Sequence, residues 1–531
     1  MAGIGEKDAV EDLQSGAEAR CLQVQFAQAA AAMHLVTDEE RIAIEAAADR
    51  LQIGVDRQGG QIRQIVATEP DPLGQSIHQR MEATVSGPSD LTHRHVVTAE
   101  CGSCHACVSV SLGCCGSLLP GLAAPISHTL ANGVELVQLE LEDAPLVCLD
   151  FWCRAGSAFE HPAESGMAHF LEHMVFKGSD GLAAGEFDRR IEALGGSSNA
   201  ATGFDDVHFH TLMPPEGAAE ALDLLLDLVL QPRLEADSFA MERQVVLEEL
   251  AQSEDQPEEV ALQHLLSLAC PDHPYGLPIL GRRQALVAHD PAAMAAFHQR
   301  QYAAGRCVLA LSGAVADGDL MRRAAEGPLA ALAPTTAAMG PATLQVIPGE
   351  HRLAVPRLEA ARLLMLWWLP AASDVEGLVG ADLGTTVLAE GRRSRLVDRL
   401  REQLQIVESI DLDLHAMEGG SFALLEAVCD EEDLAAVRGA ISQVWQELRQ
   451  ERLGEQEWWR ARRLVANGYR FSLESPGGVA SLLGSSRLWG RRQPLDQPLA
   501  LLDRWSPDRL QEQTLALLDP ARACLLEAVP A

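Results

Sequence analysis

Two successive series of apolar patterns run along residues 127–531, each passing from strand-like alternation to helical spacing. The first series predicts strands near 128–140 and 145–155, helices at 165–177 and 186–194, strands at 197–202 and 206–213, helices at 216–230, 236–254, 257–268 and 291–302, and a strand at 307–314. The second predicts a strand at 361–369, helices at 375–389 and 393–403, strands at 405–415 and 420–429, helices at 432–451, 455–473, 477–487 and 506–518, and a strand at 521–528. Strand pairs followed by long amphipathic helices are typical of the α+β class. We therefore expect two homologous domains, each an antiparallel-rich sheet covered by helices.

Small residues mark the boundary between the two series. The stretch from Ala333 to Gly349 contains three prolines and several Gly and Thr residues, a composition typical of a connecting segment. It predicts a first domain at 126–333, a linker at 334–349 and a second domain at 350–531.

Residues 1–125 precede both series and form an N-terminal extension of unknown role, which we expect to be partly disordered. Short helices are predicted at Ala27–Ala32 and Glu39–Leu51. Five of the 12 cysteines cluster here, at Cys101, Cys104, Cys107, Cys114 and Cys115. The C-x-x-C-x-x-C spacing could bind a metal or an iron–sulfur centre, but a Gly/Ser-rich, loosely ordered linker is the favoured interpretation.

Composition agrees with a large protein that has more than one core, since 47% of the 531 residues are hydrophobic. No stretch has the roughly 20 apolar residues of a membrane span. The formal charge of −35 disfavours nucleic-acid binding. Such a charge favours basic peptides as substrates if it lines a cavity, and otherwise indicates a solvated acidic surface.

The start of the chain lacks the layout of a signal peptide, and the cysteines outside the cluster are scattered singly. Both observations favour a cytoplasmic location with reduced thiols. A periplasmic location is the alternative if translation begins downstream of Met1, because residues 96–125 contain no Asp, Glu, Lys or Arg beyond Glu100.

The sequence His169-Phe170-Leu171-Glu172-His173 carries the clearest chemistry. Histidines four apart share one face of a helix, and the glutamate lies beside them. Two imidazoles suit Zn²⁺, and a neighbouring carboxylate that does not bind the metal can accept a proton from water. This H-x-x-E-H order inverts the H-E-x-x-H order of many metalloproteases. Taken alone, the motif could equally be an exposed helix face.

A catalytic zinc normally has three protein ligands, and Glu249 in a predicted amphipathic helix is the candidate for the third. The segments HFLEHMVFKGS (169–179) and ERQVVLEEL (242–250), at this separation, resemble the pitrilysin/insulinase-like zinc peptidases, which include the mitochondrial processing peptidases and their bacterial relatives. This resemblance implies one Zn²⁺ held by His169, His173 and Glu249, with Glu172 as the general base.

The resemblance extends to further residues. It implies that Glu242 supports the metal site without binding the metal itself. The alternative is that Glu242 is a solvated surface charge. The segment Gly195–Thr202, with Asn199 and Ala200, resembles the family's G-G-x-x-N-A-x-T strand, whose open edge pairs with extended substrate backbone. An ordinary Gly-Gly turn before a strand is the alternative. The H-P-Y-G sequence at 273–276 and Gly281 are interpreted as structural.

The second domain of the family contributes an Arg and a Tyr, seven residues apart, that bind the substrate carbonyl. Arg401 matches the Arg, but Glu408 occupies the Tyr position, and a carboxylate cannot donate a hydrogen bond to an oxyanion. We therefore expect a homodimer, or preferably a heterodimer with a related subunit that carries the Arg/Tyr pair. Loss of activity is the competing explanation.

Two interpretations of function follow. The first is a zinc endopeptidase that hydrolyses peptides or unfolded segments within an enclosed cavity, either to mature precursors or to clear oligopeptides. The second is a non-catalytic scaffold or assembly subunit that retains the peptidase fold. A further pair, His208 and His210, alternates on one strand face and could in principle bind a metal. It is interpreted as packed or solvent-facing, because the sequence shows no carboxylate partner.

Overall fold

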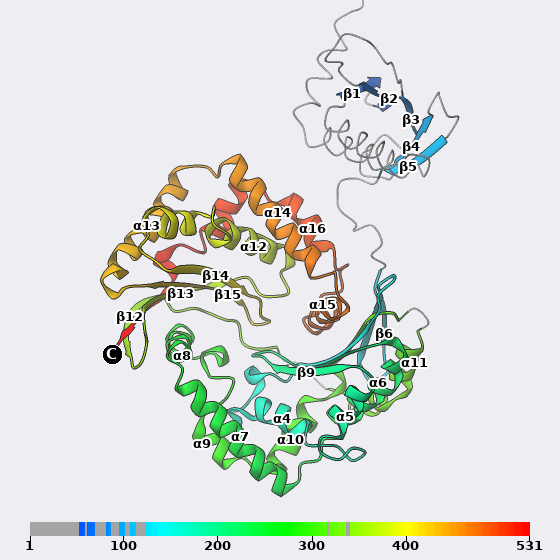
Figure 1. The fold of residues 1–531 in the computed structure, drawn as a ribbon, viewed down its shortest axis with the longest axis vertical. Coiled ribbons are helices and arrows are strands. Elements are labelled where there is room, and N and C mark those ends of the chain that lie inside the picture. The colour runs from blue at the N-terminus through cyan, green and yellow to red at the C-terminus, as the bar shows by residue number, and fades with distance from the viewer. Residues whose placement is uncertain are drawn as a thin grey trace, which may run out of the picture. The chain divides into compact units, whose positions relative to one another are not determined.

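The computed structural model describes residues 124–315, 318–335 and 340–531, together with five strands in the N-terminal part (Figure 1). Residues 1–117 and 118–531 form two compact units, each described by itself. The five strands are β1 (Gln52–Gln58), β2 (Gln61–Thr68), β3 (Met81–Ser86), β4 (His95–Glu100) and β5 (Cys107–Leu112). They pair antiparallel in chain order and were not expected from the sequence. The helices predicted at 27–32 and 39–51, and most of the cysteine cluster, lie outside the described residues.

The first domain of the larger unit is built on a six-stranded sheet in the order β6-β7-β11-β8-β10-β9. Its strands are β6 (Ile126–Thr129), β7 (Glu135–Glu140), β8 (Val147–Cys153), β9 (Ser197–Thr202), β10 (Val207–Met213) and β11 (Cys307–Gly313). Its main helices are α4 (Met167–Val175), α5 (Glu186–Ala193), α6 (Ala218–Leu230), α7 (Ala236–Glu254), α8 (Pro257–Ala269), α9 (Arg283–Ala288), α10 (Pro291–Gln301) and α11 (Asp319–Glu326). One face of this sheet forms a core with α4, α6 and α7, in which Phe151, Phe170 and Phe209 are fully buried.

The second domain repeats this plan on a five-stranded sheet in the order β12-β16-β13-β15-β14. Its strands are β12 (Gly349–Val355), β13 (Ala361–Leu369), β14 (Ser409–His415), β15 (Ser421–Cys429) and β16 (Cys524–Pro530). Its helices are α12 (Val375–Ala389), α13 (Leu434–Gln450), α14 (Glu455–Phe471), α15 (Pro476–Leu488), α16 (Gln497–Leu501) and α17 (Pro507–Arg509). In both sheets most strand pairs are antiparallel, with one parallel pair each. The expected α+β class with two sheet-plus-helix domains is confirmed.

The structure differs from the predicted elements in several places. Helices α9, α11 and α16 were not predicted, and part of the helix predicted at 506–518 is a π-helical segment, Leu510–Leu515. Strand β12 was not predicted either, because the first four residues of its sequence, GEHRLAV, have no apolar side chain and the strand alternates between half-buried and exposed positions. The helix predicted at 393–403 is a π-helical segment, Val397–Gln403. None of the helices in the described part of the chain combines the length and apolar composition that a membrane span needs.

The two domains exchange helices. Helix α8 of the first domain packs on the second sheet, where its residues share a core with β13 and β16. Helix α15 of the second domain packs on the first sheet, on the face opposite α4, against residues of β7, β8 and β11. Figure 1 shows α8 beside β12 and β13, and α15 beside the first sheet. Each domain thus contributes a helix to a core of the other, and the two form one compact unit.

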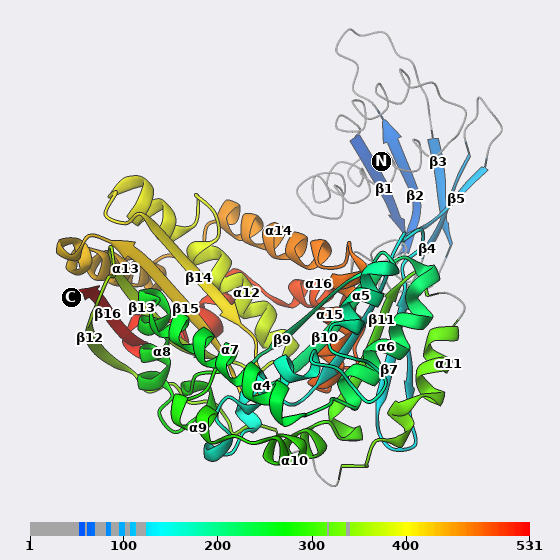
Figure 2. The same ribbon diagram turned by 60° about the horizontal axis from the view of Figure 1, so that its bottom comes forward.

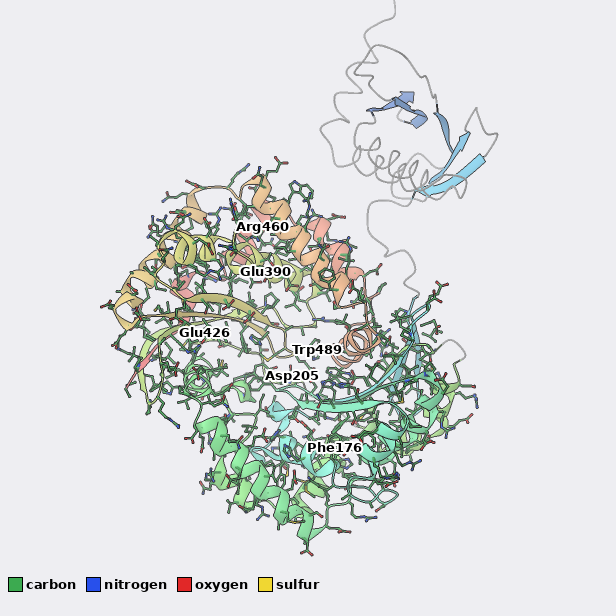
Figure 3. The ribbon with its side chains drawn as sticks, in the orientation of Figure 1. Phe176, Asp205, Glu390, Glu426, Arg460 and Trp489 are labelled. Carbon is green, nitrogen blue, oxygen red and sulfur yellow. The ribbon has the colours of Figure 1, made fainter. Side chains whose placement is uncertain are left out.

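Buried polar groups also connect the domains. Tyr275 is fully buried and donates a hydrogen bond of 2.5 Å from its hydroxyl to Asp205. The same hydroxyl accepts the backbone N–H of Gly419 at 2.9 Å, and Asp205 accepts that of Glu418 at 2.6 Å. Asp205 is labelled in Figure 3, where the two domains meet. The structural interpretation of the H-P-Y-G segment agrees with this contact.

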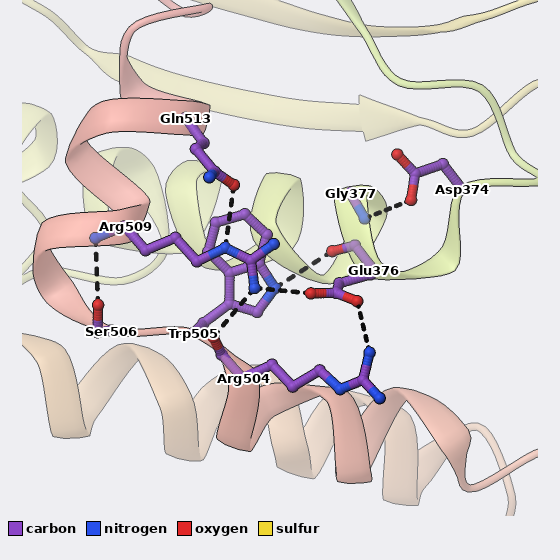
Figure 4. Close-up of polar contacts among 8 residues, drawn as sticks. All are labelled: Asp374, Glu376, Gly377, Arg504, Trp505, Ser506, Arg509 and Gln513. Carbon is purple, nitrogen blue, oxygen red and sulfur yellow. Dashed lines mark hydrogen bonds and ion pairs between the residues drawn. The ribbon is translucent and has the colours of Figure 1, made fainter.

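An ion-pair cluster fixes the start of α12 to the C-terminal helices (Figure 4). Asp374 caps α12 by accepting the Gly377 N–H at 2.9 Å. Glu376 accepts hydrogen bonds from Arg504 at 2.9 Å and Arg509 at 2.6 Å. This cluster lies in the second domain and has no contact with the candidate site.

Close contact between α15 and the first sheet depends on Gly484. A Cβ at this position would lie 2.1 Å from Trp152 on β8. Because the packed sheet cannot yield freely, Gly484→Ala is expected to lower the free energy of unfolding by about 1–3 kcal/mol. Urea unfolding measures this change. Gly477→Ala in the same helix, where a Cβ meets nothing within 4 Å, is the matched control. Equal stability of the two variants would contradict the packing argument.

Candidate metal centre

The helix that carries the H-x-x-E-H motif is held at its first turn by a half-buried carboxylate. Glu160 accepts the backbone N–H groups of Gly166 at 2.9 Å and Ala168 at 2.8 Å, which have no partner within the helix. Gly166 adopts φ 83°, and the backbone of Gly281 packs so closely on it that a Cβ on Gly281 would lie 2.4 Å from the Gly166 Cα. These contacts fix the direction of α4 and therefore of its histidines.

Helices α4 and α7 bring three metal-binding groups together. Ligand atoms of His169, His173 and Glu249 all lie within 4.8 Å of one another. The His169 Nε2 is 3.6 Å from one Glu249 oxygen, and the His173 Nε2 is 3.3 Å from the other. Tetrahedral zinc with bonds of about 2.0–2.1 Å separates neighbouring ligand atoms by about 3.3 Å. The spacing therefore suits one zinc ion between the three side chains.

A second carboxylate sets the tautomer of His173. Glu242 is only 6% exposed and lies 2.9 Å from the His173 Nδ1, while its other oxygen pairs with Lys177 at 2.7 Å. The Nδ1 proton donated to Glu242 leaves the Nε2 lone pair facing Glu249. A lone pair facing a carboxylate is unfavourable unless a cation lies between them. This observation is the main evidence that the site fits a metal ion.

His169 is suited to bind as a neutral imidazole. It is 8% exposed, and burial, with a smaller contribution from His173, lowers its pKa to about 4. Metal ligands must be deprotonated, so the low pKa favours a metal over a proton near neutral pH. Its Nδ1 has no hydrogen-bond partner among the described residues.

Glu172 lies beside the three ligands without joining them. Its carboxylate accepts a hydrogen bond of 2.6 Å from the Thr202 hydroxyl on β9. Burial raises the pKa of Glu172, while the Thr202 hydrogen bond opposes the increase. A raised pKa makes a carboxylate a better proton acceptor from water.

The site opens into a cavity of about 970 Å³. His169 and Glu172 line it, together with Thr202, residues of α7 and α8, and the loop from Gly276 to Arg283. The cavity is lined by charged groups of both signs, the carboxylates of Glu254 and Glu259 and the guanidinium groups of Arg282 and Arg283. The cavity therefore has no strong excess of negative charge.

Strand β9 forms the edge of its sheet and contacts α4 (Figure 2). Among the described residues only β10 pairs with it, which leaves its other edge open in this part of the chain. Asn199 is exposed, and its side-chain oxygen accepts the N–H of Ala200 at 3.0 Å. The arrangement is suited to pairing with an extended peptide, and the substrate-binding role of both residues stays a prediction.

The structure does not bring Arg401 to this cavity. Arg401 lies on the π-helical segment of the second domain, and its guanidinium binds the carboxylate of its neighbour Glu402 at 3.0 Å. Glu408 is exposed. Neither residue lines the cavity next to Glu172.

Sequence reasoning missed three residues around the predicted groups. Thr202 was quoted only as part of its strand, and Lys177 was not singled out, although it follows His173 by one helical turn. The third is Asp150 on β8, which hydrogen-bonds His208 at 3.1 Å. The pair His208 and His210 therefore does have a carboxylate partner, which only strand pairing could reveal.

Removing the charge of Glu242 should weaken metal binding. Glu242→Gln is expected to reduce zinc affinity about 10–100-fold, because His173 loses the carboxylate that fixes its ring. Competition with a chromophoric chelator measures the affinity. Glu248→Gln, an exposed glutamate on the same helix, is the control. Unchanged affinity in Glu242→Gln would contradict this role.

Comparison with known proteins identifies the family of the chain. A family model described as Insulinase (Peptidase family M16) matches residues 137–283, and the Peptidase M16 inactive domain matches residues 290–465. An uncharacterized zinc protease of Mycobacterium bovis is 28% identical over 386 residues, which cover 72% of this chain and 88% of that protein. A probable mitochondrial-processing peptidase subunit beta of Arabidopsis thaliana is 34% identical over 196 residues, 36% of this chain and 37% of that protein.

Solved structures agree in fold. A protease from Helicobacter pylori superposes with a TM-score of 0.72 at 21% identity, covering 77% of this chain and 100% of that chain. A peptidase M16 inactive domain from Pseudomonas fluorescens gives 0.70 at 19% identity, covering 77% and 98%. With the two domain models matched in order and zinc proteases among its relatives, the chain belongs to the insulinase-like peptidase family M16.

Proposed function

We propose that this chain is a zinc-dependent endopeptidase. The observation that carries the proposal is the approach of His169, His173 and Glu249 within 4.8 Å, with Glu172 beside them in the same cavity. A zinc ion held by the three ligands would supply Lewis acidity and lower the pKa of water.

The chain's own residues supply the remaining chemistry. Glu172 accepts a proton from the attacking water and returns it to the leaving amine. Thr202 orients the Glu172 carboxylate through its hydrogen bond. The open edge of β9 holds extended peptide backbone, which gives affinity with little dependence on substrate sequence. The substrate class is therefore peptides and unfolded segments, and the mixed charge of the cavity gives no special support to basic ones.

We also propose that a second subunit completes the site. The Arg401 guanidinium binds Glu402, and Glu408 cannot donate a hydrogen bond to an oxyanion, so the hydrogen bonds that would stabilise the developing charge beside the zinc must come from another group. A related subunit with an Arg/Tyr pair would supply it. Mixing experiments test this: cleavage should be at least about tenfold faster with such a partner than with the chain alone. Equal rates would contradict the shared site.

A non-catalytic scaffold role is the alternative that Glu408 favours. The peptidase and scaffold functions predict different results in an assay of zinc-dependent peptide hydrolysis. Peptide cleavage by the zinc-loaded chain with its partner supports the peptidase, whereas zinc binding without any cleavage supports the scaffold.

A further inference from the structure

A second group of metal-binding side chains lies on the opposite face of the first sheet. It consists of Asp150 on β8 and His208 and His210 on β10, whose ligand atoms all lie within 4.8 Å of one another. None of the three touches the residues that would hold the first metal. The side chains that alternate with them, Phe151 and Phe209, belong to the core shared with α4.

Strand pairing fixes the positions of these three residues. His210 is directly opposite Asp150 in the antiparallel pair of β10 and β8, and His208 is opposite Trp152. Histidines two apart on a strand point to the same face. Because β8 and β10 are both interior strands, the backbone positions of all three residues are rigid.

The spacing agrees with metal coordination. The His208 Nδ1 is 3.1 Å from Asp150 Oδ1, close to the roughly 3.3 Å between neighbouring ligands of tetrahedral zinc. The Trp152 ring stacks on His208 at 4.2 Å with 16° between the planes, which fixes the orientation of the imidazole. The His210 ring stacks on that of His208 at 5.6 Å and is only half-buried, so its side chain can rotate toward the other two.

Local charge favours a cation at this position. Asp150 is only 2% exposed, and a buried carboxylate requires a partner. Asp206 is also close, with its pKa raised to about 7 by burial and by the charge of Asp205. Burial alone would lower the pKa of His208, but the hydrogen bond and charge of Asp150, with Asp206 and Glu172, raise it overall. Three carboxylates therefore act on His208, an arrangement that suits a cation.

We propose that Asp150, His208 and His210 form a second binding site for a divalent transition-metal ion. Two imidazoles and one carboxylate suit Zn²⁺, Co²⁺ or Ni²⁺ and disfavour Mg²⁺ and Ca²⁺, which prefer oxygen ligands. Asn199 on β9 is directly opposite His210, so the ion would lie one strand away from the edge proposed to bind peptide. Its binding ties β8 to β10 and stabilises that edge from the opposite side.

The test isolates this site from the first. In a His169→Ala/His173→Ala background, the full chain should still bind Co²⁺, with an absorbance typical of histidine coordination, and Zn²⁺ should raise its melting temperature. Adding His210→Gln should remove one metal equivalent and the shift in melting temperature. His351→Gln, a half-buried strand histidine of the second domain, should change neither. Asp150→Asn offers a second variant if His210→Gln misfolds.

Two results would overturn the proposal. The first is that the double-alanine background binds no metal, which would leave Asp150 and His208 as a simple ion pair. The second is that binding persists unchanged in both His210→Gln and Asp150→Asn, which would place the ion elsewhere, for example at the N-terminal cysteines. Because the readout is metal content without the first site, failure here leaves the proposed peptidase function intact.

Discussion

Replacing Glu172 by glutamine is expected to lower the rate of peptide cleavage about 100- to 10,000-fold, the usual contribution of a general base. Glutamine keeps the shape of the side chain and still accepts the hydrogen bond from Thr202, but it cannot accept a proton from water. Steady-state hydrolysis of a quenched peptide, in the presence of the partner subunit, measures the loss.

The zinc content of this variant should stay near one ion per chain at the first site, because Glu172 lies beside the three ligands and is not one of them. Glu192→Gln, an exposed glutamate on α5, is the control and should retain full activity. A Glu172→Gln variant with normal zinc content and normal cleavage would show that another group accepts the proton.

Removing the Glu249 carboxylate is the second change with a large expected effect. Glu249→Gln should weaken zinc binding more than the roughly 10–100-fold expected of Glu242→Gln, because Glu249 faces both histidines directly. Cleavage should fall in proportion to the lost zinc and recover partly at high zinc concentration.

The neighbouring Glu248→Gln provides a close comparison. Glu248 lies on the same turn of α7, but it is exposed and does not face the histidines. Its variant should match the unmodified protein in zinc affinity and activity. Equal affinity in Glu249→Gln and Glu248→Gln would exclude Glu249 from the ligand set.

The sequence predicted those features of the fold and of the site that depend on residues close together in the chain. The two histidines and Glu172 could be predicted as site residues because their spacing within one helix is a local property of the sequence. The order of strands and long helices followed from periodicity for the same reason. Glu249 lies on a different helix, and only its resemblance to a known family identified it as the third candidate.

Contacts between distant elements could not be predicted. Thr202 on strand β9 reaches Glu172 on helix α4, and Asp150 meets His208 only through the pairing of β8 with β10. The exchange of α8 and α15 between domains also has no local signal, because each helix is amphipathic whichever sheet it covers. Strand β12 was missed because its parallel partner β16 is 175 residues away (Gly349 pairs with Cys524) and its own first four residues have no apolar side chain.

A zinc ion at His169, His173 and Glu249 is expected to make this chain a peptidase. The most direct test measures cleavage of a quenched peptide by the purified chain with its partner subunit, before metal chelation, after it and after zinc is restored. Chelation is expected to abolish cleavage, and zinc is expected to restore it in the unmodified chain but not in Glu172→Gln. Cleavage that persists after complete removal of zinc would show that this chain is not a zinc peptidase.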